Sequence, residues 1–149
     1  MQLNRVHVRK LVQLYIDEDV GNVDYTHSDD IVVTAEIVAK EAGVMCGAPF
    51  VRELFELLEC KTMFLVEEGL AVEVGSVIVK IMGRAPDILN GERVALNILA
   101  RTIGIATSTS HIVRHCADRG WTGRVAGTRK TTPGFRLCEK YALFIGGAD

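Results

Sequence analysis

The sequence predicts an α+β domain with an antiparallel sheet, followed by the opening elements of an α/β layer. Three features indicate this order: helical apolar spacing near the N-terminus, short β-branched runs separated by glycines, and a helix–strand–helix pattern in residues 91–149. The length of 149 residues suits one domain and part of another. A complete eight-stranded α/β barrel needs about 250 residues and does not fit in this chain.

The first expected element is an amphipathic helix. Its apolar residues recur at the three- and four-residue intervals of one helix face, at Val8, Leu11, Val12, Tyr15 and Ile16. The acidic run at 17–19 and Gly21 end this helix, and a polar loop around Asp24 to Asp30 follows.

Strands and one helix complete the predicted first domain, residues 1–90. The helix is expected between Pro49 and Glu59, where apolar residues return to helical spacing. Short β-branched runs bounded by glycines predict the strands, at Ile31–Ala39, Val44–Cys46, Thr62–Val66, Ala71–Val74 and Val77–Met82. Strands of this kind also build lipoyl- or biotinyl-carrier folds, but Lys80 lies inside a strand rather than at a hairpin tip, which favours a structural sheet.

The predicted second part, residues 91–149, begins with an interdomain helix. Residues from Ile88 to about Cys116 form one long helix or two abutting ones, and they are apolar nearly all round, which is typical of a helix between two layers. A turn at 120–123, a strand at Arg124–Thr128 and a helix opened by Thr131-Thr132-Pro133 follow, and Gly146-Gly147 ends the last helix.

Charge is distributed unevenly along the chain. The formal net charge is −2 and the isoelectric point is near 6.1. Residues 1–90 hold 8 Lys and Arg against 15 Asp and Glu, whereas residues 91–149 hold 9 against 4. A basic second part with few aromatic residues indicates polyanionic ligands rather than nucleic acid. The candidate ligand-binding cations are Arg93, Arg101, Arg124, Arg129, Lys130 and Arg136.

The four cysteines indicate a reducing compartment. They form no C-x-x-C pair and lie among apolar neighbours, at Cys46, Cys60, Cys116 and Cys138. We therefore expect buried structural thiols and no zinc site. No secretory signal is recognisable, and Asn97 and Arg101 interrupt the longest apolar stretch, so a cytoplasmic protein without a membrane span is expected.

The segment from Gly127 to Arg136 is the strongest candidate site. Arg129 and Lys130 stand where a strand is expected to end and a helix to begin, a place where α/β sheets bind phosphate or carboxylate groups. The alternative is a solvated basic turn with Pro133 as an ordinary first helical residue, and the spacing alone favours it. The glycine spacing of a nucleotide P-loop is absent.

Two long motifs resemble those of a known enzyme family. Gly91 to Thr107 and Val125 to Gly147, which includes Gly-Thr-Arg-Lys-Thr-Thr-Pro-Gly-Phe-Arg, closely resemble the quinolinate phosphoribosyltransferases. The resemblance extends more weakly upstream through Glu18-Asp19, Gly43-Val44 and Gly47.

The resemblance implies an enzyme of NAD biosynthesis. Such an enzyme transfers phosphoribosyl from phosphoribosyl pyrophosphate to quinolinate with Mg²⁺ and releases nicotinate mononucleotide, pyrophosphate and CO₂. The residues implied as catalytic are Arg129, which holds quinolinate carboxylates, and Lys130, between quinolinate and the phosphoribosyl donor. Arg93 reaches the barrel site of a neighbouring subunit, so a homodimer or larger homo-oligomer is implied. Thr128 is a secondary substrate-binding candidate.

The length of the chain qualifies this implication. Members of the family are about twice as long, so the second part is expected to be the first part of a truncated α/β barrel. The magnesium ligands are then expected in the missing half, and the chain alone is expected to be inactive. Two alternatives stay open: a non-catalytic fragment that associates with full-length subunits, and a related phosphoribosyltransferase that uses another base.

Overall fold

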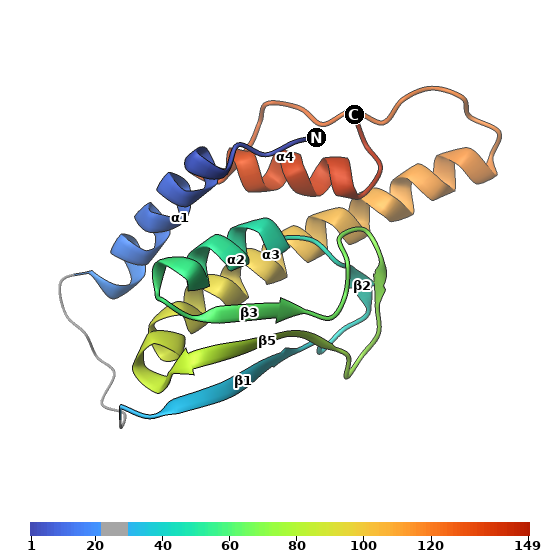
Figure 1. The fold of residues 1–149 in the computed structure, drawn as a ribbon. Coiled ribbons are helices and arrows are strands. Elements are labelled where there is room, and N and C mark those ends of the chain that lie inside the picture. Colours follow the sequence, from blue (N-terminus) through green and yellow to red (C-terminus); the bar gives the residue numbers. More distant parts are fainter. Residues whose placement is uncertain (22–29) are drawn as a thin grey trace.

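The computed structural model describes residues 1–21 and 30–149, so most of the loop expected around Asp24 to Asp30 lies outside the described residues. It shows an N-terminal α+β unit, a long helix and a short C-terminal helix packed against it (Figure 1). Within these residues no helix combines the length and the apolar character needed to cross a membrane.

The main sheet is antiparallel, as predicted. Its strands are β1 (Val32–Val38), β5 (Val77–Arg84) and β3 (Lys61–Phe64), in the order β1-β5-β3. A two-stranded ribbon pairs β2 (Gly43–Val44) with β4 (Ala71–Val72), and both of these strands are shorter than predicted. Lys80 lies in the middle of β5 opposite Glu36, with 2.8 Å between Nζ and Oε1, so it is a sheet residue and not a carrier lysine.

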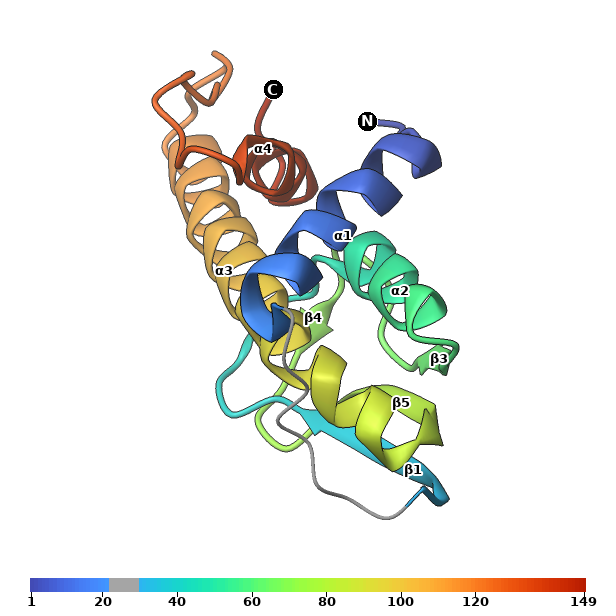
Figure 2. The same ribbon diagram turned by 90° about the vertical axis from the view of Figure 1, so that its left-hand side faces the viewer.

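Two helices cover one face of this sheet, α2 (Ala48–Leu57) and the first part of α3 (Ala85–Asp118) (Figure 2). The core between them contains Phe55 from α2 and Val79 and Ile81 from β5. Gly91 of α3 packs directly against the Phe55 ring. A larger residue would clash there, because a Cβ at position 91 would lie 2.7 Å from the ring. The opposite face of the sheet carries exposed apolar side chains.

The predicted N-terminal helix is confirmed as α1 (Arg5–Val20). The Asn4 side chain accepts a hydrogen bond from the backbone N–H of His7 and caps its first turn. Its buried stripe, Val8, Val12 and Ile16, matches the predicted face. Salt bridges from Arg5 and Arg9 of α1 to Glu53 of α2 hold the two helices together.

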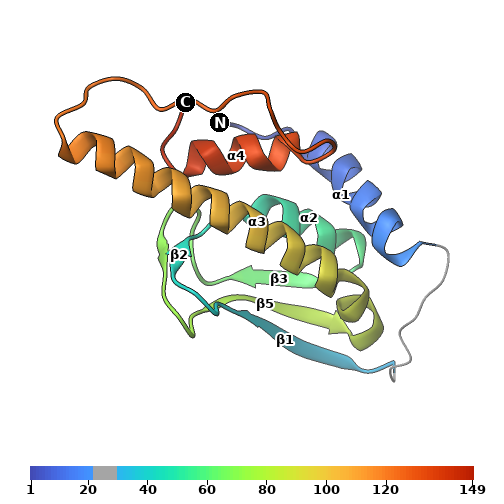
Figure 3. The same cartoon turned by 180° about the vertical axis from the view of Figure 1, so that it is seen from behind.

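Helix α3 is one continuous helix of 34 residues, which decides between the two predicted arrangements. It runs between the sheet on one side and α1 and α4 (Arg136–Ile145) on the other, as its apolar character predicted (Figure 3). The predicted domain boundary between residues 90 and 91 lies inside α3, close to its start, and stays a prediction.

The predicted strand Arg124–Thr128 is wrong. These residues form no strand, and the backbone hydrogen bonds of Val125 and Gly127 go to Asp149 near the C-terminus. The β-branched residues favour an extended backbone, but the described chain offers no strand for them to pair with.

The start of the last helix is also wrong in the prediction. Helix α4 begins at Arg136, and Thr132 to Phe135 form a turn in which the Phe135 N–H donates to the Thr132 carbonyl at 3.1 Å. Gly134 has φ +79°, which an α-helix does not allow, so Pro133-Gly134 marks a turn of type II character. Gly146 ends α4, as predicted.

Candidate functional site

The connection between α3 and α4 carries the predicted site cations. Thr128, Arg129 and Lys130 are exposed on its outer side. The Lys130 N–H donates to Thr128 Oγ1 at 3.2 Å, and the Thr131 N–H donates to the Arg129 carbonyl at 3.0 Å. We call residues 128–131 the cationic turn. The first residue of α4 comes five positions after the turn, so the two cations do not stand directly at a helix N-terminus, as the sequence had suggested.

Both charges of the cationic turn are open to a ligand. Among residues 1–21 and 30–149, neither the Arg129 guanidinium nor the Lys130 ammonium makes a salt bridge or a side-chain hydrogen bond. An exposed pair of adjacent cations in a locally fixed turn is suited to a dicarboxylate or a phosphate group.

Helix α4 anchors the cationic turn at both ends. Upstream, Lys140 Nζ donates to the Gly127 carbonyl at 2.7 Å. Downstream, Glu139 accepts hydrogen bonds from the backbone N–H of Thr132 at 3.2 Å and from its hydroxyl at 2.8 Å. Arg136 Nε also donates to Thr131 Oγ1 at 2.9 Å. The turn is therefore held at both ends by one helix.

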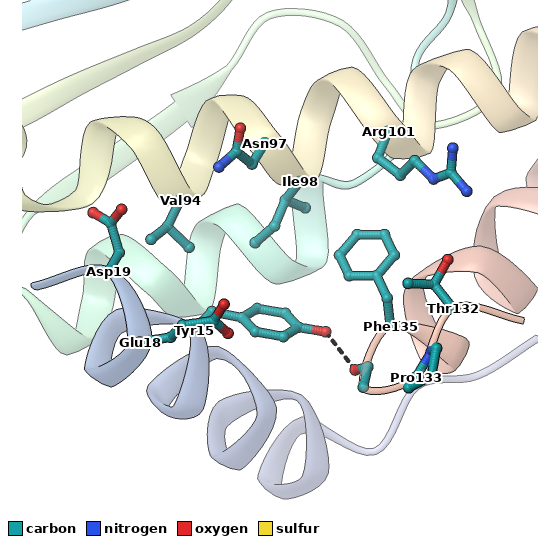
Figure 4. A pocket seen from close by; sticks show the side chains of 11 residues that line it. Tyr15, Glu18, Asp19, Val94, Asn97, Ile98, Arg101, Thr132, Pro133 and Phe135 are labelled. Carbon is teal, nitrogen blue, oxygen red and sulfur yellow. Dashed lines mark hydrogen bonds between the residues drawn. The ribbon is translucent and has the colours of Figure 1, made fainter. Parts of the chain in front are cut away.

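A cavity of about 580 Å³ lies between α1, α3 and the residues that follow the cationic turn (Figure 4). Tyr15 and Phe135 form part of its wall, with ring centroids 5.8 Å apart. The Tyr15 hydroxyl donates to the Gly134 carbonyl at 2.8 Å, which fastens the connection to α1. The lining residues are Tyr15, Glu18, Asp19, Val94, Asn97, Ile98, Arg101, Thr132, Pro133, Gly134 and Phe135.

Arg101 lines this cavity, whereas Arg93 does not. Arg101 forms a salt bridge with Glu139 of α4 at 3.1 Å, whereas Arg93 pairs with Asp19 of α1 at 3.1 Å. Eight residues of helix separate them, a rise of about 12 Å. The structure thus places Arg101 next to the anchor of the cationic turn and does not bring Arg93 to the turn within one chain.

The remaining sequence-predicted cations have structural partners. Arg136 bonds to Thr131, as described above, and Arg124 pairs with Asp149 at 3.3 Å, with both side chains largely exposed. An exposed pair of this kind contributes little to stability.

The protonation states of Glu139 and Tyr15 suit their roles as hydrogen-bond acceptor and donor. Burial raises the pKa of the Glu139 carboxyl, but hydrogen bonds from Thr132 and Arg101 outweigh this, so its pKa lies below the usual value. Glu139 is therefore a charged acceptor at neutral pH. Burial, with the nearby Cys138 thiol, raises the pKa of Tyr15, so its hydroxyl stays a neutral donor.

The cysteines show the packing expected from the sequence. Cys46, Cys60 and Cys138 are buried and Cys116 is partly buried, and all four are free. Burial raises the pKa of Cys138 to about 12. A buried thiol of this kind is a packing residue and not a nucleophile.

The sequence did not identify Glu139, Lys140 or Tyr15 as parts of the site. Periodicity places Tyr15 on the apolar face of α1 but does not show where its hydroxyl bonds. The Pro133-Gly134 pair was a signal for the turn that positions Thr132.

The expectation that Mg²⁺ is held by residues beyond this chain stays a prediction. Within the described part of the chain, no three His, Cys, Asp or Glu side chains lie close enough together to hold a metal ion. The residues present therefore do not form a protein site for Mg²⁺.

Comparisons with known proteins identify the family and the fold of this chain. The family model "Quinolinate phosphoribosyl transferase, N-terminal domain" matches residues 22–103, and the C-terminal domain model of the same family matches residues 105–149. The human nicotinate-nucleotide pyrophosphorylase (carboxylating) is 42% identical over 145 residues, which cover 96% of this chain and 49% of the human protein. The probable enzyme of that name from Bacillus subtilis is 39% identical over 150 residues, which cover 97% of this chain and 51% of its own.

Solved structures show the same fold. The nicotinate-nucleotide pyrophosphorylase from Francisella tularensis superimposes with a TM-score of 0.90 at 30% identity, over 99% of this chain and 54% of that one. The chain spans about half the length of the curated relatives it matches. These matches confirm the predicted order of an α+β unit followed by the first part of the barrel domain. Since the N-terminal domain model alone covers more than half of the sequence, the chain belongs to the quinolinate phosphoribosyltransferase family.

Proposed function

We propose that the cationic turn holds quinolinate in a phosphoribosyltransferase that forms nicotinate mononucleotide, pyrophosphate and CO₂ from quinolinate and phosphoribosyl pyrophosphate. The observation that carries this proposal is the exposed pair Arg129-Lys130, which has no salt-bridge partner among the described residues and lies on an anchored turn. Family membership supports it, and the names of the relatives point to the same reaction.

The chemistry suits such a turn. Both substrates are polyanions, and the anomeric carbon becomes cation-like as the bond to pyrophosphate breaks, so positioned charges matter more than a nucleophile. Arg129 presents a planar fork of donors to the carboxylates, and Lys130 presents a point charge between the two substrates. Magnesium is proposed to arrive with phosphoribosyl pyrophosphate, and its protein ligands are proposed to lie in the half of the relatives' length that this chain does not span.

Calorimetric titration of the purified chain with quinolinate tests the proposal. Arg129→Ala is expected to weaken binding by about 30-fold or more, because a charge-assisted hydrogen bond to a carboxylate contributes roughly 1.5–3 kcal/mol and this side chain can make two. Lys130→Ala is expected to weaken it by about tenfold.

Arg114→Ala is the matched control, because it removes an exposed cation of α3 that lies outside the turn. Equal binding by Arg129→Ala and Arg114→Ala contradicts the proposed site. Titration with a pyridine monocarboxylate in parallel distinguishes quinolinate from another base. We expect the chain alone to form no nicotinate mononucleotide from quinolinate, phosphoribosyl pyrophosphate and Mg²⁺, and measurable product overturns that expectation.

We propose that a second copy of this chain covers the open face of the main sheet. Val32, Met63 and Met82 are exposed there by 72%, 56% and 46%, and Leu65 at the end of β3 is exposed as well. These apolar side chains come from three neighbouring strands and alternate with Lys61, Lys80 and Glu36 on the same face. Exposed apolar side chains gathered on one face are typical of an interface. Arg93, whose side chain is 64% exposed and lies away from the turn of its own chain, is proposed to act in the site of the neighbouring subunit.

Sedimentation of the chain tests the dimer. The unchanged chain is expected to sediment as a dimer at about 50 μM and Met82→Glu as a monomer, because the interface then has to desolvate an added carboxylate, which pairing with the neighbouring Lys61 does not fully offset. Leu14→Glu places the same charge on the exposed side of α1 and is expected to leave the dimer intact. A monomeric unchanged chain, or a dimeric Met82→Glu variant, contradicts this interface.

The proposal also includes the location of the protein. A cytoplasmic location is favoured by the four free thiols.

A non-catalytic role is the second candidate function, and the exposed sheet face favours it. Co-expression with a full-length relative tests this role. Mixed oligomers are expected only if the exposed sheet face also accepts the longer subunit.

A further inference from the structure

The connection between α3 and α4 is long for a segment that must hold charges in place. Residues 119–135 contain neither helix nor strand in the described structure, and connections above about 12–15 residues without secondary structure are uncommon in compact domains unless they are functional. An unanchored segment of this length has many conformations, and binding a ligand to it costs the entropy of ordering it.

Glu139 fixes the segment from the side of α4. It is 7% exposed and accepts three hydrogen bonds, two from Thr132 and one from Arg101 of α3. Glu139 lies in the first turn of α4, where a negative charge is favourable, and it accepts the backbone N–H of Thr132 upstream of the helix start. Glu139 therefore joins α3, α4 and the residue that follows the cationic turn.

Tyr15 fixes the segment from the side of α1. Its hydroxyl donates to the Gly134 carbonyl, and its ring packs against Phe135. Tyr15 and Gly134 are 119 positions apart, so this contact connects the N-terminal helix with the residues that follow the cationic turn. Figure 4 shows Tyr15 reaching across the cavity toward the connection.

We propose that Glu139 and Tyr15 are positioning residues, which hold residues 132–134 from opposite sides and thereby fix the direction of Arg129 and Lys130. The inference rests on the proposed binding of quinolinate by the cationic turn. It adds two groups that never touch the ligand, one of which belongs to the N-terminal helix.

The geometry explains why both contacts matter. The Lys140 bond to Gly127 fixes only the upstream end of the turn. Without the Glu139 and Tyr15 bonds, only the exposed bond from Arg136 Nε to Thr131 Oγ1 holds the downstream end. The turn then moves about Gly127, so the two cations no longer meet the carboxylates together. Preorganised charges lose binding energy when the groups that support them are removed, even though the charges remain.

Quinolinate titration of two conservative variants is the first measurement. Tyr15→Phe removes one oxygen atom and is expected to raise the dissociation constant by roughly 3- to 10-fold. Glu139→Gln keeps the shape but faces an amide NH₂ toward the Thr132 N–H, and an increase of roughly tenfold or more is expected. The control is Glu53→Gln, at a buried, salt-bridged glutamate away from the turn, and this variant is expected to bind as the unchanged chain does.

Limited trypsin digestion of the folded variants is the second measurement and needs no ligand. Trypsin cleaves after Arg129 and Lys130, and cleavage reports local opening of the backbone. Tyr15→Phe and Glu139→Gln are expected to raise the cleavage rate at these two bonds by about fivefold. Cleavage after Arg119, upstream of the anchors, is expected to stay unchanged.

The two measurements separate the possible failures. If the unchanged chain binds no quinolinate, the proposed function fails, and the digestion still decides whether Glu139 and Tyr15 hold the turn. Unchanged cleavage at the turn in both variants overturns the positioning role. Faster cleavage with unchanged quinolinate binding also overturns it, because the two residues then only stabilise the connection.

Discussion

Phe50→Ala is expected to lower the free energy of unfolding by about 3–5 kcal/mol, the usual cost of removing a buried phenylalanine ring. The Phe50 side chain comes from α2 and is 0% exposed. It meets Tyr141 of α4 edge to face, with centroids 5.6 Å apart and planes at 77°. Urea unfolding followed by circular dichroism measures the change.

Phe144→Ala is the matched control, because Phe144 lies on α4 and is 46% exposed. It is expected to cost less than about 1 kcal/mol. Since Tyr141 directly follows the helix residues that anchor the cationic turn, Phe50→Ala is also expected to weaken quinolinate binding. Similar losses of stability in the two variants would mean that this aromatic contact does not join α4 to the N-terminal unit.

The N-terminal unit was largely predictable because its elements are amphipathic and pack locally. The stripe of Val8, Val12 and Ile16 gives a helix with one buried face, and the short β-branched runs mark strands β1, β3 and β5. The order and register of these strands were not predicted. The ends of β2 and β4 were less predictable, because β2 packs on α3 and pairs with β4, and no local pattern contains these contacts.

Residues 119–135 were predictable only in part. The pair Arg129-Lys130 is visible in the sequence, and family resemblance assigns it a role, but periodicity says nothing about the bonds that anchor it. Glu139 looks like an ordinary exposed helix residue in the sequence, whereas the structure buries it under Arg101 and Thr132. Arg101 itself was a candidate ligand-binding cation and instead pairs with this carboxylate.

The two wrong predictions, a strand at Arg124–Thr128 and a helix that begins near Pro133, have the same cause. Local propensity favoured an extended Arg124–Thr128 and a helix from Pro133, because both patterns are common in those structures. A strand also requires a partner, and a helix requires αR backbone angles, which Gly134 at φ +79° does not have. Propensity describes single residues. A partner strand and a continuous run of αR backbone angles depend instead on other parts of the chain.

Gly146→Ala is expected to lower the free energy of unfolding by about 1–3 kcal/mol, the range of overpacked positions. Gly146 ends α4 where it crosses α3, and a Cβ there would lie 2.6 Å from both the Ala106 carbonyl oxygen and the Thr109 Cβ. The Ala106 carbonyl oxygen and the Thr109 Cβ are both fixed by the backbone of α3, so no side-chain rotation relieves these contacts. The two helices must therefore move apart.

Gly104→Ala is the matched control on α3 itself. A Cβ at Gly104 meets no atom within 4 Å, and alanine in a helix interior is favoured over glycine by about 0.5–1 kcal/mol. The same substitution is thus expected to stabilise the protein at one glycine and destabilise it at the other, as thermal unfolding can measure. If Gly146→Ala is neutral or stabilising, close packing of α4 on α3 does not hold the helix that anchors the cationic turn. Its position would then depend on the hydrogen bonds of Glu139 and Lys140.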